Sequence, residues 1–110
     1  MTELERHGAV TVIRPTMTLT CDYVDSLSDR IDEGIAGGIP MIVVDMTASA
    51  LIDGAGLEWL LSLDEKCSLR GGSVRVTGVS ELCNDILRVT GVGESVAQYD
   101  SLTDALASFS

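Results

Sequence analysis

The residues best suited to chemistry lie in one short turn, Asp53-Gly54-Ala55-Gly56, between an apolar segment and an amphipathic one. Backbone amides at the start of a helix attract anions, so this turn could hold one. Two glycines without a nearby lysine are a weak signal for such a site. Asp53 is suited to capping the helix, because its carboxylate can accept amide hydrogens that the first turn leaves unpaired. Two interpretations of Asp53 stay open: a cap alone, or a residue that also binds a partner.

The sequence offers little for catalysis or metal binding. His7 is the only histidine and is expected on the surface. There is no plausible Ser-His-Asp set and no G-x-x-x-x-G-K-S/T phosphate loop. Cys21, Cys67 and Cys83 lack the close paired spacing of a zinc site, and Cys67 is expected to be a small buried apolar residue. We therefore expect a non-catalytic protein without a cofactor or a metal.

The turn must be positioned by a strand before it and a helix after it. Residues 41–46 form a short apolar run with one carboxylate, Asp45, which is typical of a strand covered on both faces. The helix should run from the turn to about Arg70, with an apolar face made of Gly56, Leu57, Leu60, Leu63 and Cys67. Trp59 lies at the margin of this face, where it either closes the edge of the core or exposes part of its ring to a partner. Glu58, next to it, faces outward.

The remaining chain alternates between strand and helix patterns. Residues 3–8 are polar and predict a loop or the approach to a strand. Further strands are expected over residues 9–14, 17–20, 74–76 and 95–99. Helices are expected over residues 23–35, from Ser80 to Gly91, and from Ser101 to Phe109. For the second of these, Ser80 is the expected cap and Gly91 and Gly93 are the expected terminators. Its expected apolar face comprises Leu82, Cys83, Ile86 and Leu87. This alternation predicts an α/β fold in one domain, residues 1–110, with a mixed sheet of four to five strands packed with about four helices.

Composition narrows the functional classes. The 110 residues include 17 acidic and 7 basic side chains, a net charge of −10. Such a charge argues against binding nucleic acid or an anionic membrane surface, since either would repel the protein. With no leader and no apolar run of membrane-spanning length, the sequence predicts a cytoplasmic protein without direct membrane insertion. A homodimer is left open.

Several segments, taken in order, resemble the STAS domain of bacterial anti-sigma-factor antagonists. An apolar strand ends in Val43-Val44-Asp45, and the segment Ile52-Asp53-Gly54-Ala55-Gly56-Leu57 opens a helix. Arg70-Gly71-Gly72 precedes the next strand. The segments 86–92, ILRVTGV, and 99–106, YDSLTDAL, match the family's helix ending in T-G and its closing helix. The resemblance covers nearly the whole chain and implies a STAS-like fold.

The chain departs from the family at the site of its regulatory switch. In the family, a serine just before the glycine of this turn is phosphorylated by a partner kinase, which switches binding off. Here that slot holds Ala55, which has no hydroxyl, and the slot before it holds Gly54. A phosphate there would place roughly −1.5 to −2 charges at a helix N-terminus. A second departure is Thr20, which stands where the family has an aspartate. Thr47, Ser49 and Ser62 are alternative phosphate acceptors near the same surface.

The resemblance implies a protein-interaction module whose partner is an anti-sigma factor that is also a serine kinase. The implied binding surface spans residues 45–58 and the start of the helix. The residues expected to bind the partner are Asp53, Gly54, Ala55, Gly56, Glu58, Trp59 and Thr20. Without the family's serine, this surface is expected to stay in one state. Two alternatives remain: a cytoplasmic STAS subunit of an ABC-type lipid transport complex, and a module that binds a small ligand at the helix-start amides.

Overall fold

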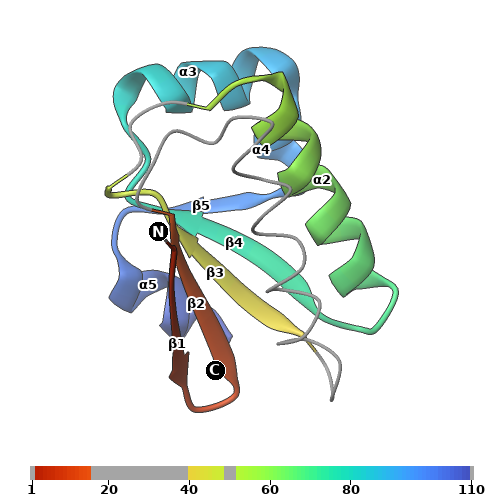
Figure 1. Cartoon of the computed structure of the whole chain (residues 1–110), viewed down its shortest axis with the longest axis vertical. Coiled ribbons are helices and arrows are strands. Elements are labelled where there is room, and N and C mark those ends of the chain that lie inside the picture. The colour runs from red at the N-terminus through yellow and green to blue at the C-terminus, as the bar shows by residue number, and fades with distance from the viewer. Residues whose placement is uncertain (1, 16–39, 49–51, 110) are drawn as a thin grey trace.

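The computed structural model describes residues 2–15, 40–48 and 52–109 (Figure 1). Five strands form one sheet: β1 (Thr2–His7), β2 (Val10–Pro15), β3 (Met41–Asp45), β4 (Ser73–Thr77) and β5 (Ala97–Tyr99). Four helices lie within the described residues: α2 (Gly54–Ser68), α3 (Glu81–Thr90), α4 (Val92–Ser95) and α5 (Leu102–Ala107). The predicted strand over residues 17–20 and helix over 23–35, with Cys21, lie outside the described residues.

The sheet is mixed, as predicted, and its spatial order follows the chain: β1-β2-β3-β4-β5. β1 pairs antiparallel with β2, whereas β2, β3, β4 and β5 run parallel. The loop interpretation of residues 3–8 is wrong, because all six residues of β1 pair with β2. The apolar pattern did not reveal β1, since an edge strand can be formed from mostly polar residues.

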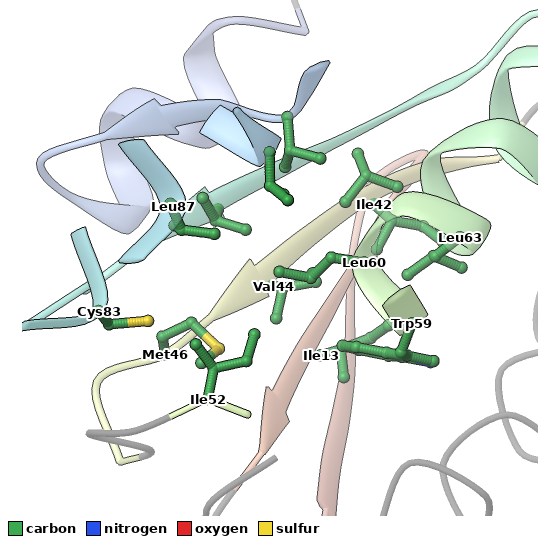
Figure 2. Packing of buried hydrophobic residues seen from close by; sticks show 14 of the residues in the cluster. Ile13, Ile42, Val44, Met46, Ile52, Trp59, Leu60, Leu63, Cys83 and Leu87 are labelled. Atoms are coloured by element: carbon green, nitrogen blue, oxygen red, sulfur yellow. The ribbon is translucent and has the colours of Figure 1, made fainter. Parts of the chain in front are cut away.

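The central strand β3 is buried on both faces, as its apolar run predicts. Ile42 and Val44 pack on one side in a cluster with residues of α2, α3 and α4. Val43 packs on the other side with Val10, Val12 and Ala105 of α5. Of the described helices, α2, α3 and α4 therefore cover one face of the sheet and α5 covers the other (Figure 1). Figure 2 shows the larger cluster beneath α2.

The helix boundaries follow from local capping. The Ser80 hydroxyl accepts the Cys83 amide hydrogen and starts α3, and Gly91, in the left-handed conformation with φ +80°, ends it. Gly93 was expected to terminate the same helix, but it lies inside α4, a single turn that the sequence did not predict. Leu82 was expected on the apolar face of α3 and is 55% exposed, whereas Cys83 and Leu87 are buried. No described helix combines the length and apolar character needed to cross a membrane.

Candidate functional site

The α2 N-terminal surface, which we define as Asp53, Gly54, Ala55, Gly56 and Glu58, begins with a regular helix cap. The Asp53 carboxylate accepts the Gly56 amide hydrogen at 3.0 Å, and the Asp53 carbonyl accepts that of Leu57 at 3.0 Å. The predicted cap at Asp53 is confirmed, and its further role in binding a partner stays a prediction. Because the cap fixes the first turn of α2, the side chains that follow are presented on a rigid element.

The predicted binding residues differ in their access to solvent. Asp53, Gly54 and Glu58 are exposed, Ala55 is half-buried and Gly56 is buried. A Cβ atom added at Gly54 would meet nothing within 4 Å, so this position is sterically open. Thr20 lies outside the described residues.

Of the two interpretations of Trp59, the one in which it closes the edge of the core is confirmed, and the one with a partly exposed ring is wrong. Its relative exposure is 7%, and it belongs to the core cluster that includes Ile13 of β2 and Leu60 and Leu63 of α2. Figure 2 shows the ring next to Ile13. At a helix margin, the residue count alone cannot decide between core and surface, because the neighbouring strand sets where the core ends. Trp59 thus stabilises the base of the surface instead of presenting its ring to a partner.

A polar clamp, comprising Glu5, Arg14, Asp45 and Thr47, holds the chain where β3 ends and the loop toward α2 begins. Asp45 is largely buried; one carboxylate oxygen, Oδ1, accepts the Thr47 amide hydrogen at 3.0 Å and the Thr47 hydroxyl hydrogen at 2.5 Å. Its other oxygen, Oδ2, accepts from Nε of Arg14 at 3.2 Å. Charged hydrogen bonds of this kind are stronger than neutral ones, so Asp45 fixes the first residues of the loop.

Arg14 extends the clamp to the edge strand. Its Nη1 lies 2.5 Å from Oε1 of Glu5. The hydrogen bond from Arg14, followed by a smaller contribution from His7, lowers the pKa of Glu5 to about 2. The hydrogen bond to Glu5 in turn raises the pKa of Arg14. β1, β2 and β3 are thereby linked by alternating charges at one end of the sheet.

Gly78 packs directly against the clamp, and its lack of a side chain is required there. Its φ of +69° lies in the left-handed region that favours glycine. A Cβ atom at this position would overlap the Thr47 hydroxyl oxygen and lie 2.8 Å from the Thr47 amide nitrogen and 2.9 Å from Oδ1 of Asp45. The residue after β4 therefore packs against the loop that leaves β3.

Sequence reasoning missed the roles of Glu5, Arg14 and Gly78. A signal was present: Arg14 and Asp45 each stand near the carboxyl end of an expected strand. In the structure β2 and β3 are parallel neighbours with Ile13 opposite Val44, which brings Arg14 beside Asp45. The order of the strands, which the sequence pattern did not give, was needed to pair them.

The alternative phosphate acceptors have different surroundings. The Thr47 hydroxyl donates to Asp45, so a phosphate on it would bring a dianion against a carboxylate. Ser62, on α2, is exposed. Ser49 lies outside the described residues. The geometry therefore disfavours Thr47 as a phosphate acceptor.

Other reactive groups lie away from the α2 N-terminal surface or are buried. His7 is exposed, and its Nε2 lies 3.0 Å from Glu5 near the turn between β1 and β2. Cys67 and Cys83 are buried free thiols, as expected for Cys67. Burial raises the pKa of both thiols, to about 11 for Cys67. Across residues 2–15, 40–48 and 52–109, no three His, Cys, Asp or Glu side chains gather in a way that could hold a metal ion.

Comparison with known proteins identifies relatives of this arrangement. A family model described as the STAS domain matches residues 1–105. A search of curated protein sequences finds no significant match. Among solved structures, a candidate anti-sigma factor antagonist of Thermotoga maritima aligns with a TM-score of 0.90 at 16% identity, covering 97% of this chain and 92% of the other. An anti-sigma factor antagonist of Mycobacterium paratuberculosis aligns with a TM-score of 0.86 at 24% identity, covering 98% and 92%.

A transporter also contains a similar domain. The murine solute carrier 26 family member A9, an anion transporter, aligns with a TM-score of 0.79 at 14% identity, covering 94% of this chain and 18% of the transporter chain. At these identities the structural matches establish the shared fold. The predicted STAS-like fold is confirmed by them and by the family match.

Proposed function

This chain belongs to the STAS domain family, and from that membership we propose that it is a non-catalytic protein-interaction module of the anti-sigma-factor-antagonist kind. Its partner is a regulatory protein, an anti-sigma factor with serine kinase character, and its role is in transcription control. The observation that carries this proposal is the capped, exposed start of α2 on the end of the sheet where β3 ends. The structural likeness to two anti-sigma factor antagonists supports it.

We propose that the partner docks on the α2 N-terminal surface. Asp53, Gly54 and Glu58 offer an exposed, acidic and sterically open patch around the half-buried Ala55. The polar clamp fixes the chain where it leaves β3, because Asp45 accepts hydrogen bonds from the amide and the hydroxyl of Thr47. A rigid surface loses little conformational freedom on binding, which favours affinity.

In this proposal, the α2 N-terminal surface can bind its partner at all times. Ala55 occupies the position that carries the family's phosphorylated serine, and an alanine cannot accept a phosphoryl group. Protein purified from its own organism should therefore carry no phosphate on the α2 N-terminal surface. An Ala55→Ser variant should become a kinase substrate only if a cognate kinase docks here.

The proposal of a non-catalytic module rests on where the titratable groups lie. Asp53 caps α2 and Asp45 is hydrogen-bonded in the clamp. His7 pairs with Glu5 near the β1–β2 turn, beside Val10, whereas α2 begins beyond the far ends of β2 and β3. Asp53 and Asp45 therefore have structural partners, whereas Glu58 is an exposed carboxylate on the α2 N-terminal surface without the histidine of the sequence beside it.

A second candidate function is a STAS subunit of a transport complex, such as an ABC-type lipid transporter. The observation that favours it is the likeness to a domain within a solute carrier anion transporter. That domain is a small part of a long transporter chain, so this reading has less support than the likeness to proteins of nearly the same length.

The experiment that separates these functions is an affinity pull-down from native lysate, with the bound proteins identified by mass spectrometry. Recovery of a serine-kinase-like anti-sigma factor supports the regulatory function. Recovery of a transporter ATPase instead makes the chain a transport subunit. The Ala55→Asp variant serves as the control, since it places a negative charge on the α2 N-terminal surface and should lose the partner in either case.

A further inference from the structure

A small polar cavity lies at the carboxyl ends of β4 and β5, with no residue in common with the α2 N-terminal surface. Its volume is about 240 Å³. The loop after β4 contributes Gly78 and Val79, the first turns of α3 contribute Glu81 and Asn84, and the end of β5 contributes Gln98, Tyr99 and Asp100. The cavity thus lies beyond the carboxyl ends of two parallel neighbouring strands.

The cavity presents hydrogen-bonding groups that the described chain does not use. The side chains of Glu81, Asn84, Gln98 and Asp100 make no hydrogen bond or ion pair among residues 2–15, 40–48 and 52–109. Two are carboxylates and two are carboxamides, whose oxygens accept hydrogen bonds. Among the described residues, no lysine or arginine lines the cavity. All four side chains are exposed to solvent, and the two carboxylates give the cavity a negative charge that a cationic donor complements.

The donor that fits best is a guanidinium group. It is planar, always charged and carries five N–H donors in a fixed fork, which suits two carboxylates set among amide oxygens. A metal ion is a poorer fit, because only two of the lining residues are metal-ligating carboxylates and the described part of the chain gathers no group of three. The chemistry therefore selects an arginine-like cation.

The size of the cavity favours a side chain over a free small molecule. Pockets for whole small molecules usually span about 300–1,000 Å³, and this one is smaller. Leu82, the neighbour of Glu81, is 55% exposed on α3. An apolar residue flanking the arginine in a polypeptide can rest on Leu82 while the guanidinium enters the cavity. We propose that this cavity binds an arginine side chain of a protein partner.

The test uses two probes that differ in charge but hardly in shape. N-acetyl-arginine amide and the uncharged N-acetyl-citrulline amide are titrated into the ¹⁵N-labelled chain, and amide shifts are followed at Gly78, Asn84 and Gln98. The arginine probe is expected to shift these signals saturably, and the citrulline probe is not. Equal shifts from both probes would overturn the proposal, because the charge would then be irrelevant.

Matched variants separate the site from the general charge of the protein. The double variant Glu81→Gln, Asp100→Asn removes both cavity carboxylates. It should raise the Kd of the arginine probe about tenfold, because each exposed ion pair that is lost accounts for about threefold. The pair Glu94→Gln and Asp104→Asn removes the same two charges from the first turns of α4 and α5 and should change the Kd less than twofold. An equal loss in both pairs would show only nonspecific attraction and would refute the site.

A third arm tests for the protein source of the guanidinium. A Leu-Arg-Leu peptide with blocked ends should bind more tightly than the arginine amide, and Leu82→Ser should remove that gain while leaving the arginine amide unaffected. If the peptide binds no better than free arginine, the site takes a free guanidinium compound and the partner proposal is wrong. None of these outcomes depends on the identity of the partner that docks at α2.

Discussion

Replacing Gly78 with alanine tests the packing of the loop after β4 against the polar clamp. The added Cβ atom would overlap the Thr47 hydroxyl oxygen and lie 2.9 Å from Oδ1 of Asp45. One of these groups must move, and any movement lengthens the hydrogen bonds that Thr47 makes to Asp45. We therefore expect Gly78→Ala to release the loop from the clamp as well as to strain the backbone.

The magnitude has two parts, and a second glycine isolates one of them. A side chain in the left-handed conformation costs about 1–2 kcal/mol. Gly71 has φ +81° but nothing within 4 Å of its Cβ position, so Gly71→Ala should lose only that amount. Gly78→Ala should also weaken hydrogen bonds to a carboxylate, which are each worth about 1.5–3 kcal/mol. The free energy of unfolding should fall by about 3–5 kcal/mol for Gly78→Ala.

The assay is urea denaturation of both variants and the wild type, followed by circular dichroism. The Gly78 variant should lose at least about 1.5 kcal/mol more than the Gly71 variant, as one lost charged hydrogen bond requires. Adding Thr47→Ala to Gly78→Ala removes the overlapped oxygen, so the double loss should be smaller than the sum of the single losses. Equal losses at the two glycines, or simple additivity with Thr47, would refute the clamp reasoning.

Three further predictions follow from single residues. The folded pKa of Glu5, about 2, lies below its ordinary value of 4.5, so its ion pair stabilises the fold above about pH 4.5 and loses this effect as pH falls through 2. The urea midpoint of the wild type should therefore fall between pH 5 and 2, and Glu5→Gln should make that fall shallower. An unchanged slope would contradict the pairing. Burial raises the pKa of Cys67 to about 11, so iodoacetamide at pH 8 should label this thiol slowly in the native protein and rapidly in urea. Peptide mass spectrometry measures the labelling, and rapid labelling of the native protein would place the thiol at the surface. Gly54→Ala should raise the free energy of unfolding by up to about 1 kcal/mol, because the position is open and helical. Asp53→Ala should lower the free energy of unfolding by about 1 kcal/mol, because the helix cap is lost. A lower free energy of unfolding in both variants would contradict the open position at Gly54.

Local sequence signals predicted much of the fold, because they depend on neighbours in the chain. The caps at Asp53, Ser80 and Ser101 and the terminator Gly91 act within one helical turn, and the structure has all four. The apolar run of β3 correctly predicted burial on both faces. These features need no knowledge of which strands are adjacent.

The remaining features depend on tertiary neighbours. Trp59 is buried because β2 lies beside α2 and places Ile13 in the same cluster as its ring, which helical periodicity could not show. Leu82 is exposed although its spacing fits the apolar face of α3, because the core takes in Cys83 and Leu87, with Ile86 packed against it. The clamp requires Arg14 and Asp45 to lie on adjacent parallel strands. Both the burial of Trp59 and the pairing of Arg14 with Asp45 therefore depend on the order of the strands, which the sequence pattern did not predict.

The most direct test of the central claim measures how tightly the recovered partner binds three forms of the chain. Ala55→Asp places a charge at the second helical position of α2, and Thr103→Asp places one at the same position of α5, on the opposite face of the sheet. By isothermal titration calorimetry, we expect Ala55→Asp to weaken binding at least tenfold and Thr103→Asp to leave it within twofold of wild type. Unchanged affinity in Ala55→Asp, or an equal loss in both variants, would contradict docking on the α2 N-terminal surface.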